Sequence, residues 1–126
     1  MSLIVNGKTI IDDNKILQNI NHFRFDGGSL NIGAPHTLNF NNSHYKLSGG
    51  GAISFTNNPP ANTIASMIVI LVGSGYTWPG GGVMKWNEGL EPPQSSSNQS
   101  VFEINAYTFN DGSTRYYGSL IAYNAS

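Results

Sequence analysis

The chain of 126 residues contains no cysteine. Composition therefore excludes a disulfide framework, a thiolate nucleophile and a cysteine-ligated zinc site. The three histidines, His22, His36 and His44, show neither His-x-His nor His-Glu-x-x-His spacing, and no run of alternating carboxylates forms a calcium loop. We expect no metal and no other cofactor.

Charged side chains are scarce as well. They make up 10% of the residues, against about 25% in ordinary soluble domains, and the formal net charge is -1. This balance favours neither nucleic acid nor an anionic membrane as a partner. A surface with so little charge is poorly protected against association by charge repulsion. We therefore expect a protein whose working form is an assembly.

Long apolar runs are also missing. The longest, residues 67–72, is far shorter than the roughly 20 residues that span a bilayer. The opening segment, residues 1–7, has neither the basic stretch nor the apolar centre of a signal peptide. We expect neither a membrane span nor secretion.

The motifs of common catalytic sites are absent from the sequence. The glycines at 73–75 and 80–82 lead into a strand pattern, not into the Gly-Lys-Ser/Thr and helix of a phosphate-binding loop. There is no Gly-x-Ser-x-Gly elbow for a serine nucleophile. Glu103 lies in a predicted strand and could project into a groove, but the sequence ties no second carboxylate to it for glycoside cleavage. We therefore expect a protein that is not an enzyme.

What the sequence does contain is a series of short strands. Gly, Pro and Asn interrupt the apolar runs before a long amphipathic helix can form, and those runs are rich in β-branched and aromatic residues. Turn signals at close intervals predict an all-β fold, an antiparallel sandwich or barrel of jelly-roll-like type. Residues 66–72 are apolar on both alternating faces, so we expect a strand at the centre of the fold or at a subunit interface, covered on both sides.

Hairpins are predicted near both ends of the sequence. Residues 3–5 and 9–11, separated by the turn signal Asn6-Gly7, predict a small N-terminal hairpin. Residues 101–109 and 114–123 predict a C-terminal hairpin, with Asp111-Gly112 suited to a type I′ turn.

The aromatic residues of the C-terminal half have two interpretations. Flat rings suit the C–H faces of sugars, and Trp78, Trp86, Tyr116 and Tyr117 form a candidate binding surface for a glycan. The interpretation that we favour is packing, in the core or at a subunit interface, where aromatic rings contribute most of the area. Tyr116 and Tyr117 are adjacent in a predicted strand, so one should point inward and the other outward.

Parts of the sequence resemble segments of tailed-bacteriophage virion proteins. "YTWPGGGVMKWNEGLEPP", at 76–93, and "VFEINAYTFNDGSTRYYGSL", at 101–120, are similar to a C-terminal module in which a Trp-Pro…Val-Lys-Trp…Gly…Pro strand pair precedes a hairpin with Asp-Gly at its turn. "VNGKTIIDDNKILQNI", at 5–20, is similar to the openings of phage fibre segments. The matching positions of the C-terminal module are Trp78, Pro79, Val83, Lys85, Trp86, Gly89, Pro92, Tyr107, Phe109, Asp111, Gly112, Tyr117 and Gly118.

The sequence departs from the family pattern in three places. Met84 is inserted between the valine and the lysine, Arg115-Tyr116 stands where tryptophan is common, and Lys15 replaces an arginine. The resemblance implies a structural protein of the virion, trimeric by family habit, whose β-rich subunits intertwine or exchange strands. It brings no catalytic residues with it.

The length of the chain guides the choice of a role on the particle. A tail fibre needs an attachment region and a distal tip, and 126 residues are few for both. We therefore expect a capsid decoration (cement) protein, made in the host cytoplasm, that sits on the capsid surface and clamps the major capsid protein. The alternative is a short tail-fibre or receptor-binding adhesin that recognises a host surface glycan. A third hypothesis, a lectin-like module unrelated to virions, predicts a monomer.

The expected organisation is an N-terminal arm, residues 1–25, followed by a β-sandwich body, residues 26–126. Residues 3–25 are expected to pair with a neighbouring subunit by strand addition. The apolar residues predicted for the subunit or capsid interface are Leu3, Ile4, Val5, Ile10, Ile11, Ile16, Leu17 and Ile20.

Overall fold

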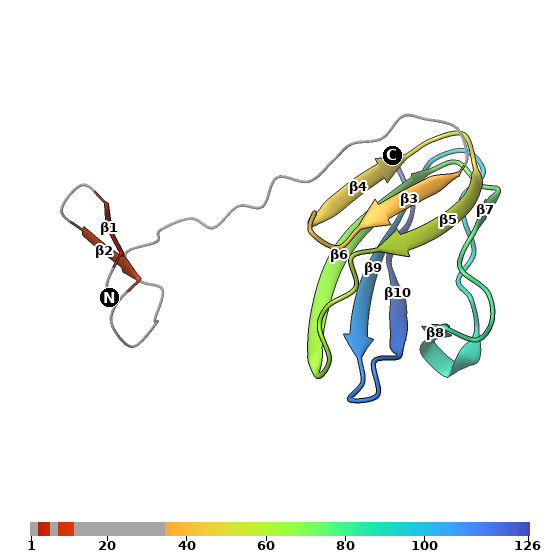
Figure 1. Cartoon of the computed structure of the whole chain (residues 1–126). Helices are drawn as coiled ribbons and strands as arrows, with labels where there is room; N and C mark the ends of the chain where they lie inside the picture. Colours follow the sequence, from red (N-terminus) through yellow and green to blue (C-terminus); the bar gives the residue numbers. More distant parts are fainter. Residues whose placement is uncertain (1–2, 6–7, 12–34) are drawn as a thin grey trace.

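The computed structural model describes residues 3–5, 8–11 and 35–126, and these residues form a β-rich structure (Figure 1). The described residues contain no α-helix; η1 (Asn87–Gly89) is a short 3-10 turn. Residues 35–126 form two sheets, one of three strands and one of five. The predicted β class is confirmed.

The smaller sheet has the strand order β3-β5-β7, and all its strands are parallel. Its members are β3 (His36–Asn39), β5 (Gly51–Thr56) and β7 (Tyr76–Thr77). The larger sheet is mixed, in the order β4-β6-β9-β10-β8. Its members are β4 (His44–Leu47), β6 (Thr63–Val72), β9 (Gln99–Thr108), β10 (Thr114–Ala125) and β8 (Met84–Trp86). The three long strands are antiparallel, and β4 and β8 run parallel to their neighbours at the two edges.

The parallel pairs follow from the path of the chain. From β3 to β8, successive strands alternate between the two sheets (Figure 1). Each time the chain comes back to a sheet, the new strand therefore runs parallel to the previous strand that the chain formed in that sheet. The expectation of an antiparallel fold is wrong for this part, because the turns carry the chain across to the facing sheet rather than back beside the preceding strand. The sheets also stay open at their edges, so the closed barrel is not the architecture.

The core lies between the two sheets. In β6, side chains alternate between the core and the opposite face, and Met67, Val69 and Leu71 are at most 1% exposed. Burying each of these side chains stabilises the fold by roughly 1.5–3 kcal/mol. The buried apolar residues are Leu38, Phe40, Tyr45, Leu47, Ile53, Met67, Val69, Leu71, Tyr76, Trp78, Phe102, Ile104, Ala106 and Tyr116.

Strand β6 lies inside the larger sheet, between β4 and β9, so the predicted central position of residues 66–72 is confirmed. Only one of its faces is buried, however. Ile68, Ile70 and Val72 point away from the core and remain partly exposed, and Ile64 is 61% exposed. Within the residues that the structure describes, the predicted cover on the second face is therefore missing.

Strands β9 and β10 confirm the predicted C-terminal hairpin, but its turn is not type I′. Gly112 has a φ of 89°, whereas Asn110 and Asp111 have no positive φ. The N–H of Phe109 donates to the carbonyl of Ser113 (2.8 Å), and the N–H of Gly112 donates to the carbonyl of Phe109 (3.0 Å). This pattern is a type I turn followed by a left-handed glycine. Oδ1 of Asp111 accepts hydrogen bonds from the N–H and the hydroxyl of Ser113, which stabilises this alternative turn.

Strand β8 joins the larger sheet out of sequence order. It follows β7 in the chain but pairs with β10, so the β9–β10 hairpin lies between β6 and β8. Trp86 is the register partner of Gly118. A Cβ atom added to Gly118 would lie 2.3 Å from the ring carbon Cζ3 of Trp86. Glycine at position 118 therefore makes room for the Trp86 ring against the backbone of β10.

The N-terminal strands form a separate two-stranded sheet. β1 (Leu3–Val5) and β2 (Lys8–Ile11) are antiparallel, with a register shift between Leu3 and Ile4. The predicted N-terminal hairpin is confirmed. The predicted boundary between arm and body, at residues 25 and 26, lies outside the described residues.

Candidate functional site

The four aromatic residues predicted as a binding surface do not share an exposed face. Trp78 and Tyr116 are buried in the core, and Trp86 is partly buried against it. Tyr117 is 42% exposed on the opposite side of β10. Tyr116 thus points inward and Tyr117 outward, as the alternation predicted. The burial of the other three rings favours packing over sugar stacking.

The buried rings form an aromatic cluster between the sheets. The ring centroid of Trp78 lies 5.1 Å from that of Phe102 and 5.5 Å from that of Trp86, both in edge-to-face geometry. Such pairs contribute about 0.5–1.5 kcal/mol beyond the area they bury. The hydroxyl of Tyr116 donates to Oδ1 of Asn58 at 2.8 Å, so its polar atom is satisfied. The cluster therefore stabilises the fold, and the buried rings of Trp78, Phe102 and Tyr116 are not open to a ligand.

The histidines occupy unrelated environments. His36 is fully buried, and its Nε2 lies 2.8 Å from the carbonyl oxygen of Gly50, to which it donates. Its ring packs against Tyr76, and burial raises the pKa of the Tyr76 hydroxyl. His44 is exposed on β4, and His22 lies outside the described residues. In the part of the chain that the structure describes, no three His, Cys, Asp or Glu residues are grouped to hold a metal ion.

The predicted interface residues of the arm are placed only in part. Leu3, Ile4 and Val5 lie in β1, and Ile10 and Ile11 lie in β2. The remaining three, Ile16, Leu17 and Ile20, lie outside the described residues. The contact of this set with a neighbouring subunit or a capsid stays a prediction.

The larger sheet exposes an apolar surface on the side turned away from the smaller sheet, which we call the outer face. Ile64 lies opposite Tyr107, and Ile70 lies opposite Val101. Five of the six strongly exposed large apolar residues of the described chain lie on β6, on the tip of the C-terminal hairpin or on β10. The apolar residues of the outer face are Ile64, Ile68, Ile70, Val72, Val101, Tyr107 and Tyr117. Several apolar side chains exposed on one sheet face make that face a candidate interaction surface.

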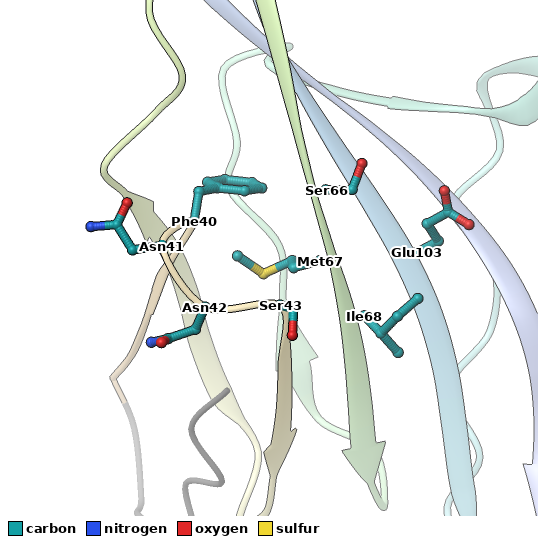
Figure 2. A pocket seen from close by; sticks show the side chains of 8 residues that line it. All are labelled: Phe40, Asn41, Asn42, Ser43, Ser66, Met67, Ile68 and Glu103. Carbon is teal, nitrogen blue, oxygen red and sulfur yellow. The ribbon is translucent and has the colours of Figure 1, made fainter. Parts of the chain in front are cut away.

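A cavity of about 470 Å³ lies beside β6, at the point where its neighbour β4 begins (Figure 2). β4 pairs with residues 68–71 of β6, and residues 63–67 of β6 have no strand on that side among the described residues. We call this cavity, together with the unpaired edge of β6, the edge slot. Its lining residues are Phe40, Asn41, Asn42, Ser43, Ser66, Met67, Ile68 and Glu103.

Side chains from both faces of the larger sheet line the edge slot. Phe40 and Met67 belong to the core, whereas Ile68 and Glu103 belong to the outer face (Figure 2). The turn of residues 40–43 carries Asn41 and Asn42 into the lining beside β6. The slot therefore combines an apolar inner wall with a polar rim.

The backbone of β6 directs hydrogen-bonding groups into the edge slot. The N–H of Ile68 donates to the carbonyl of Ser43 at 2.9 Å, so the backbone of Ile68 faces the β4 side. Alternate residues of a strand turn their N–H and C=O groups to the same edge. The backbone groups of Ile64 and Ser66 therefore face the open side too.

Glu103 places a negative charge on the wall of the slot. Its Oε1 accepts a 3.1 Å hydrogen bond from Nδ2 of Asn105. Oδ1 of Asn105 in turn accepts a hydrogen bond from the hydroxyl of Ser66. These bonds orient the carboxylate, and within the described residues its hydrogen-bond donor is a neutral amide and not a cation.

One residue of this site was noted in the sequence. Glu103 could project into a groove from its predicted strand, and the structure places it in the lining of the edge slot. Ser66 and Asn105 were missed because their contact joins strands 39 residues apart. One sequence feature pointed to this region. Residues 66–72 are apolar on both faces of their strand, and the second face has no cover within the described part of the subunit.

Comparisons with protein-family models, with curated proteins and with solved structures found no match to this chain. In the residues that the structure describes, no helix has the length and apolar character to cross a bilayer. The outer face and the edge slot are therefore the features from which a function can be inferred.

Proposed function

We propose that this chain is a structural protein of a tailed-bacteriophage virion and acts as a trimeric capsid decoration (cement) protein. The observation that supports this function best is the apolar outer face of the larger sheet, centred on β6, β9 and β10. Such a surface suits association with other subunits. The resemblance of residues 76–93 and 101–120 to phage virion modules supports the class of protein.

The physical demands of the role agree with this surface. A cement protein has to hold neighbouring major capsid proteins together against the pressure of packaged DNA. Contacts made by apolar area and by backbone hydrogen bonds depend little on ionic strength, unlike contacts between charges. A chain with 10% charged residues and an exposed apolar sheet face is suited to such contacts.

The proposed assembly is a homotrimer on the capsid surface, with jelly-roll-like bodies that contact one another through the outer face. The N-terminal arm, residues 1–25, reaches a neighbouring molecule and intertwines the subunits. An isolated two-stranded sheet such as β1–β2 is marginally stable in water, so it gains from pairing with a neighbour. The partners are other copies of the chain and the major capsid protein, and neither nucleic acid nor a membrane takes part.

The first prediction tests the outer face. Changing the exposed Ile64 of β6 to Asp should shift the trimer to monomers and abolish binding to capsids that lack the decoration protein, because burying the new charge at an interface is unfavourable. Light scattering coupled to gel filtration measures the mass, and co-sedimentation with the capsids measures the binding.

Leu90→Asp is the matched control, since Leu90 is equally apolar and exposed but lies after η1, outside the strands of the larger sheet. It should leave both mass and binding unchanged. A wild-type protein that is monomeric and binds neither capsids nor tails would contradict the proposed function.

The alternative, a tail-fibre or adhesin that binds a host glycan, has less support. A glycan surface needs exposed ring faces, and of the four candidate rings only Tyr117 is strongly exposed. Binding of the isolated protein to a glycan array, lost in Tyr117→Ala, would favour this alternative over the cement protein.

A further inference from the structure

We propose that the edge slot accepts a β-strand and that strand β2 of a second copy of this chain fills it. The inference rests on the proposed function, because that assembly brings several copies together. It deepens the proposal by naming both the segment of the arm that binds and the site that receives it.

The first argument is the geometry of the acceptor. β6 spans Thr63–Val72, and β4 covers only residues 68–71 on one side. Residues 63–67, ahead of this pairing, form a sheet edge whose Ile64 and Ser66 backbone groups point outward. An exposed edge of this kind is a template for pairing with another strand. Peptides that add to such an edge gain affinity from backbone hydrogen bonds and specificity from flanking pockets.

The second argument is that the slot limits how a strand can enter. The turn of residues 40–43 closes the end next to β4 (Figure 2). An added strand would thus lie in line with β4, between this turn and the start of β6. Successive side chains would alternate between the inner wall, with Phe40 and Met67, and the outer wall, with Ile68 and Glu103. The slot therefore favours a short strand that is apolar and carries one positive charge.

The third argument is that β2 has these properties. Its sequence is Lys8-Thr9-Ile10-Ile11, four residues with one lysine and two isoleucines. An extended strand rises about 3.3 Å per residue, so four residues match the free edge of β6 in length. Within the described residues, β2 pairs with β1 alone, so its other edge has backbone groups to offer.

The fourth argument is charge complementarity. The Glu103 carboxylate is oriented by an amide and has no cation as its hydrogen-bond partner in the described chain. Arg115, also on the larger sheet, donates to the carbonyl of Thr114 and lies over the Phe109 ring. Lys8 would bring the missing positive charge to the slot as β2 enters.

The absence of cysteine makes a direct test possible. Lys8 and Ile10 lie on the same face of β2. Ile10 should therefore point to the outer wall, with Glu103 and Ser66. One preparation carries Ile10→Cys and a second carries Ser66→Cys, and the two are mixed under mild oxidation. A disulfide between positions 10 and 66, identified as a cross-linked peptide by mass spectrometry, is the expected result. Ser119→Cys, exposed on β10 and away from the slot, replaces Ser66→Cys in the control and should give little cross-link to position 10.

Two variants test the chemistry of the contact. Lys8→Glu should lower the yield of the 10–66 cross-link about two- to fivefold, as expected for a surface ion pair, and Glu103→Lys in the same chains should restore it. Ile64→Pro removes an N–H group that faces the slot, so it should abolish the cross-link while the far-ultraviolet circular dichroism stays unchanged. Proline is tolerated on such an edge. Ala65→Pro, whose N–H faces β9, should instead unfold the sheet.

The remaining outcomes are equally decisive. A double variant, Ile10→Cys with Ser66→Cys, that cross-links only within single chains would overturn the assignment to a second copy. A yield no higher than in the Ser119→Cys control would overturn the acceptor site itself. If trimers still form and still bind capsids in that case, the proposed function survives. If the 10–66 cross-link forms but capsids are not bound, the acceptor site survives and the capsid role fails.

Discussion

Gly118 is the residue on which the packing of β8 depends most directly. Any side chain at this position meets the Trp86 ring, because even a Cβ atom would lie 2.3 Å from Cζ3. We expect Gly118→Ala to lower the free energy of unfolding by about 1–3 kcal/mol, the usual cost of overpacking a core. Urea unfolding followed by tryptophan fluorescence measures this loss.

A second background separates the clash from other effects of the substitution. In a Trp86→Leu chain the ring is gone, so adding Gly118→Ala should cost clearly less than it does in the native chain. Ser119→Ala, at the next and exposed position of β10, should be nearly neutral. Equal costs of Gly118→Ala in both backgrounds would show that Trp86 is not the cause.

Asp111 makes the C-terminal turn sensitive to acid. Hydrogen bonds from the hydroxyl and the N–H of Ser113 hold the pKa of the Asp111 carboxyl below its usual value of 3.8. Because the pKa is lower in the folded chain, the carboxylate contributes stability above pH 3.8, and this contribution is lost as the pH falls through the folded pKa.

The third prediction follows from this shift. Asp111→Asn keeps an oxygen that can accept both hydrogen bonds of Ser113 but does not titrate. Urea unfolding across the acid range should therefore show a shallower loss of stability with falling pH in Asp111→Asn than in the native chain. An identical pH dependence in both proteins would assign the acid sensitivity to other groups.

Among the elements, β6 has two faces with separate tasks. Leu71 points into the core and Ile70 points to the outer face. Leu71→Ala should lower the free energy of unfolding by about 2–5 kcal/mol, because it leaves a cavity between the sheets. Ile70→Thr keeps a β-branched side chain on a partly exposed face, so it should cost much less stability and weaken association instead.

Two measurements together check this division. Denaturant unfolding at low protein concentration reports the stability of the subunit, and sedimentation equilibrium reports the association. A loss of subunit stability in Ile70→Thr as large as in Leu71→Ala would contradict separate roles for the two faces.

Local patterns predicted the elements better than their arrangement. Apolar runs and turn signals were sufficient for β6 and both hairpins, since they reflect contacts close in sequence. The parallel winding was missed because a turn signal shows where a strand ends and not whether the chain then crosses to the facing sheet. The turn type was missed because the Asp111 side chain, bonded to Ser113, stabilises a conformation other than the one Asp-Gly most often adopts.

The candidate site was harder to predict than the fold. Periodicity showed that Tyr116 and Tyr117 face opposite sides, but it could not show that Trp78 and Trp86 are packed against Phe102, a residue of another strand. The edge slot depends on β4 being shorter than β6, and a difference in strand length is visible only once the two strands are paired.

For the whole molecule, the scarcity of charge has a measurable consequence. If copies associate through the outer face, the dissociation constant should change little between about 0.1 M and 1 M salt, although the Debye length falls from about 10 Å to about 3 Å. Analytical ultracentrifugation at both salt concentrations checks this prediction. Dissociation at high salt would indicate that charged groups, and not apolar area, hold the subunits together.

The place of β8 constrains how the molecule is made. A ribosome releases β8 before β9 and β10, yet the strand against which β8 lies is β10, the later of the two. In a nascent chain β8 therefore has no strand to pair with, and Trp86 lacks its contact with Gly118, until residues 114–125 have been synthesised. Cells that produce this protein in quantity should depend on chaperones during that interval, because unfinished sheets are prone to aggregate.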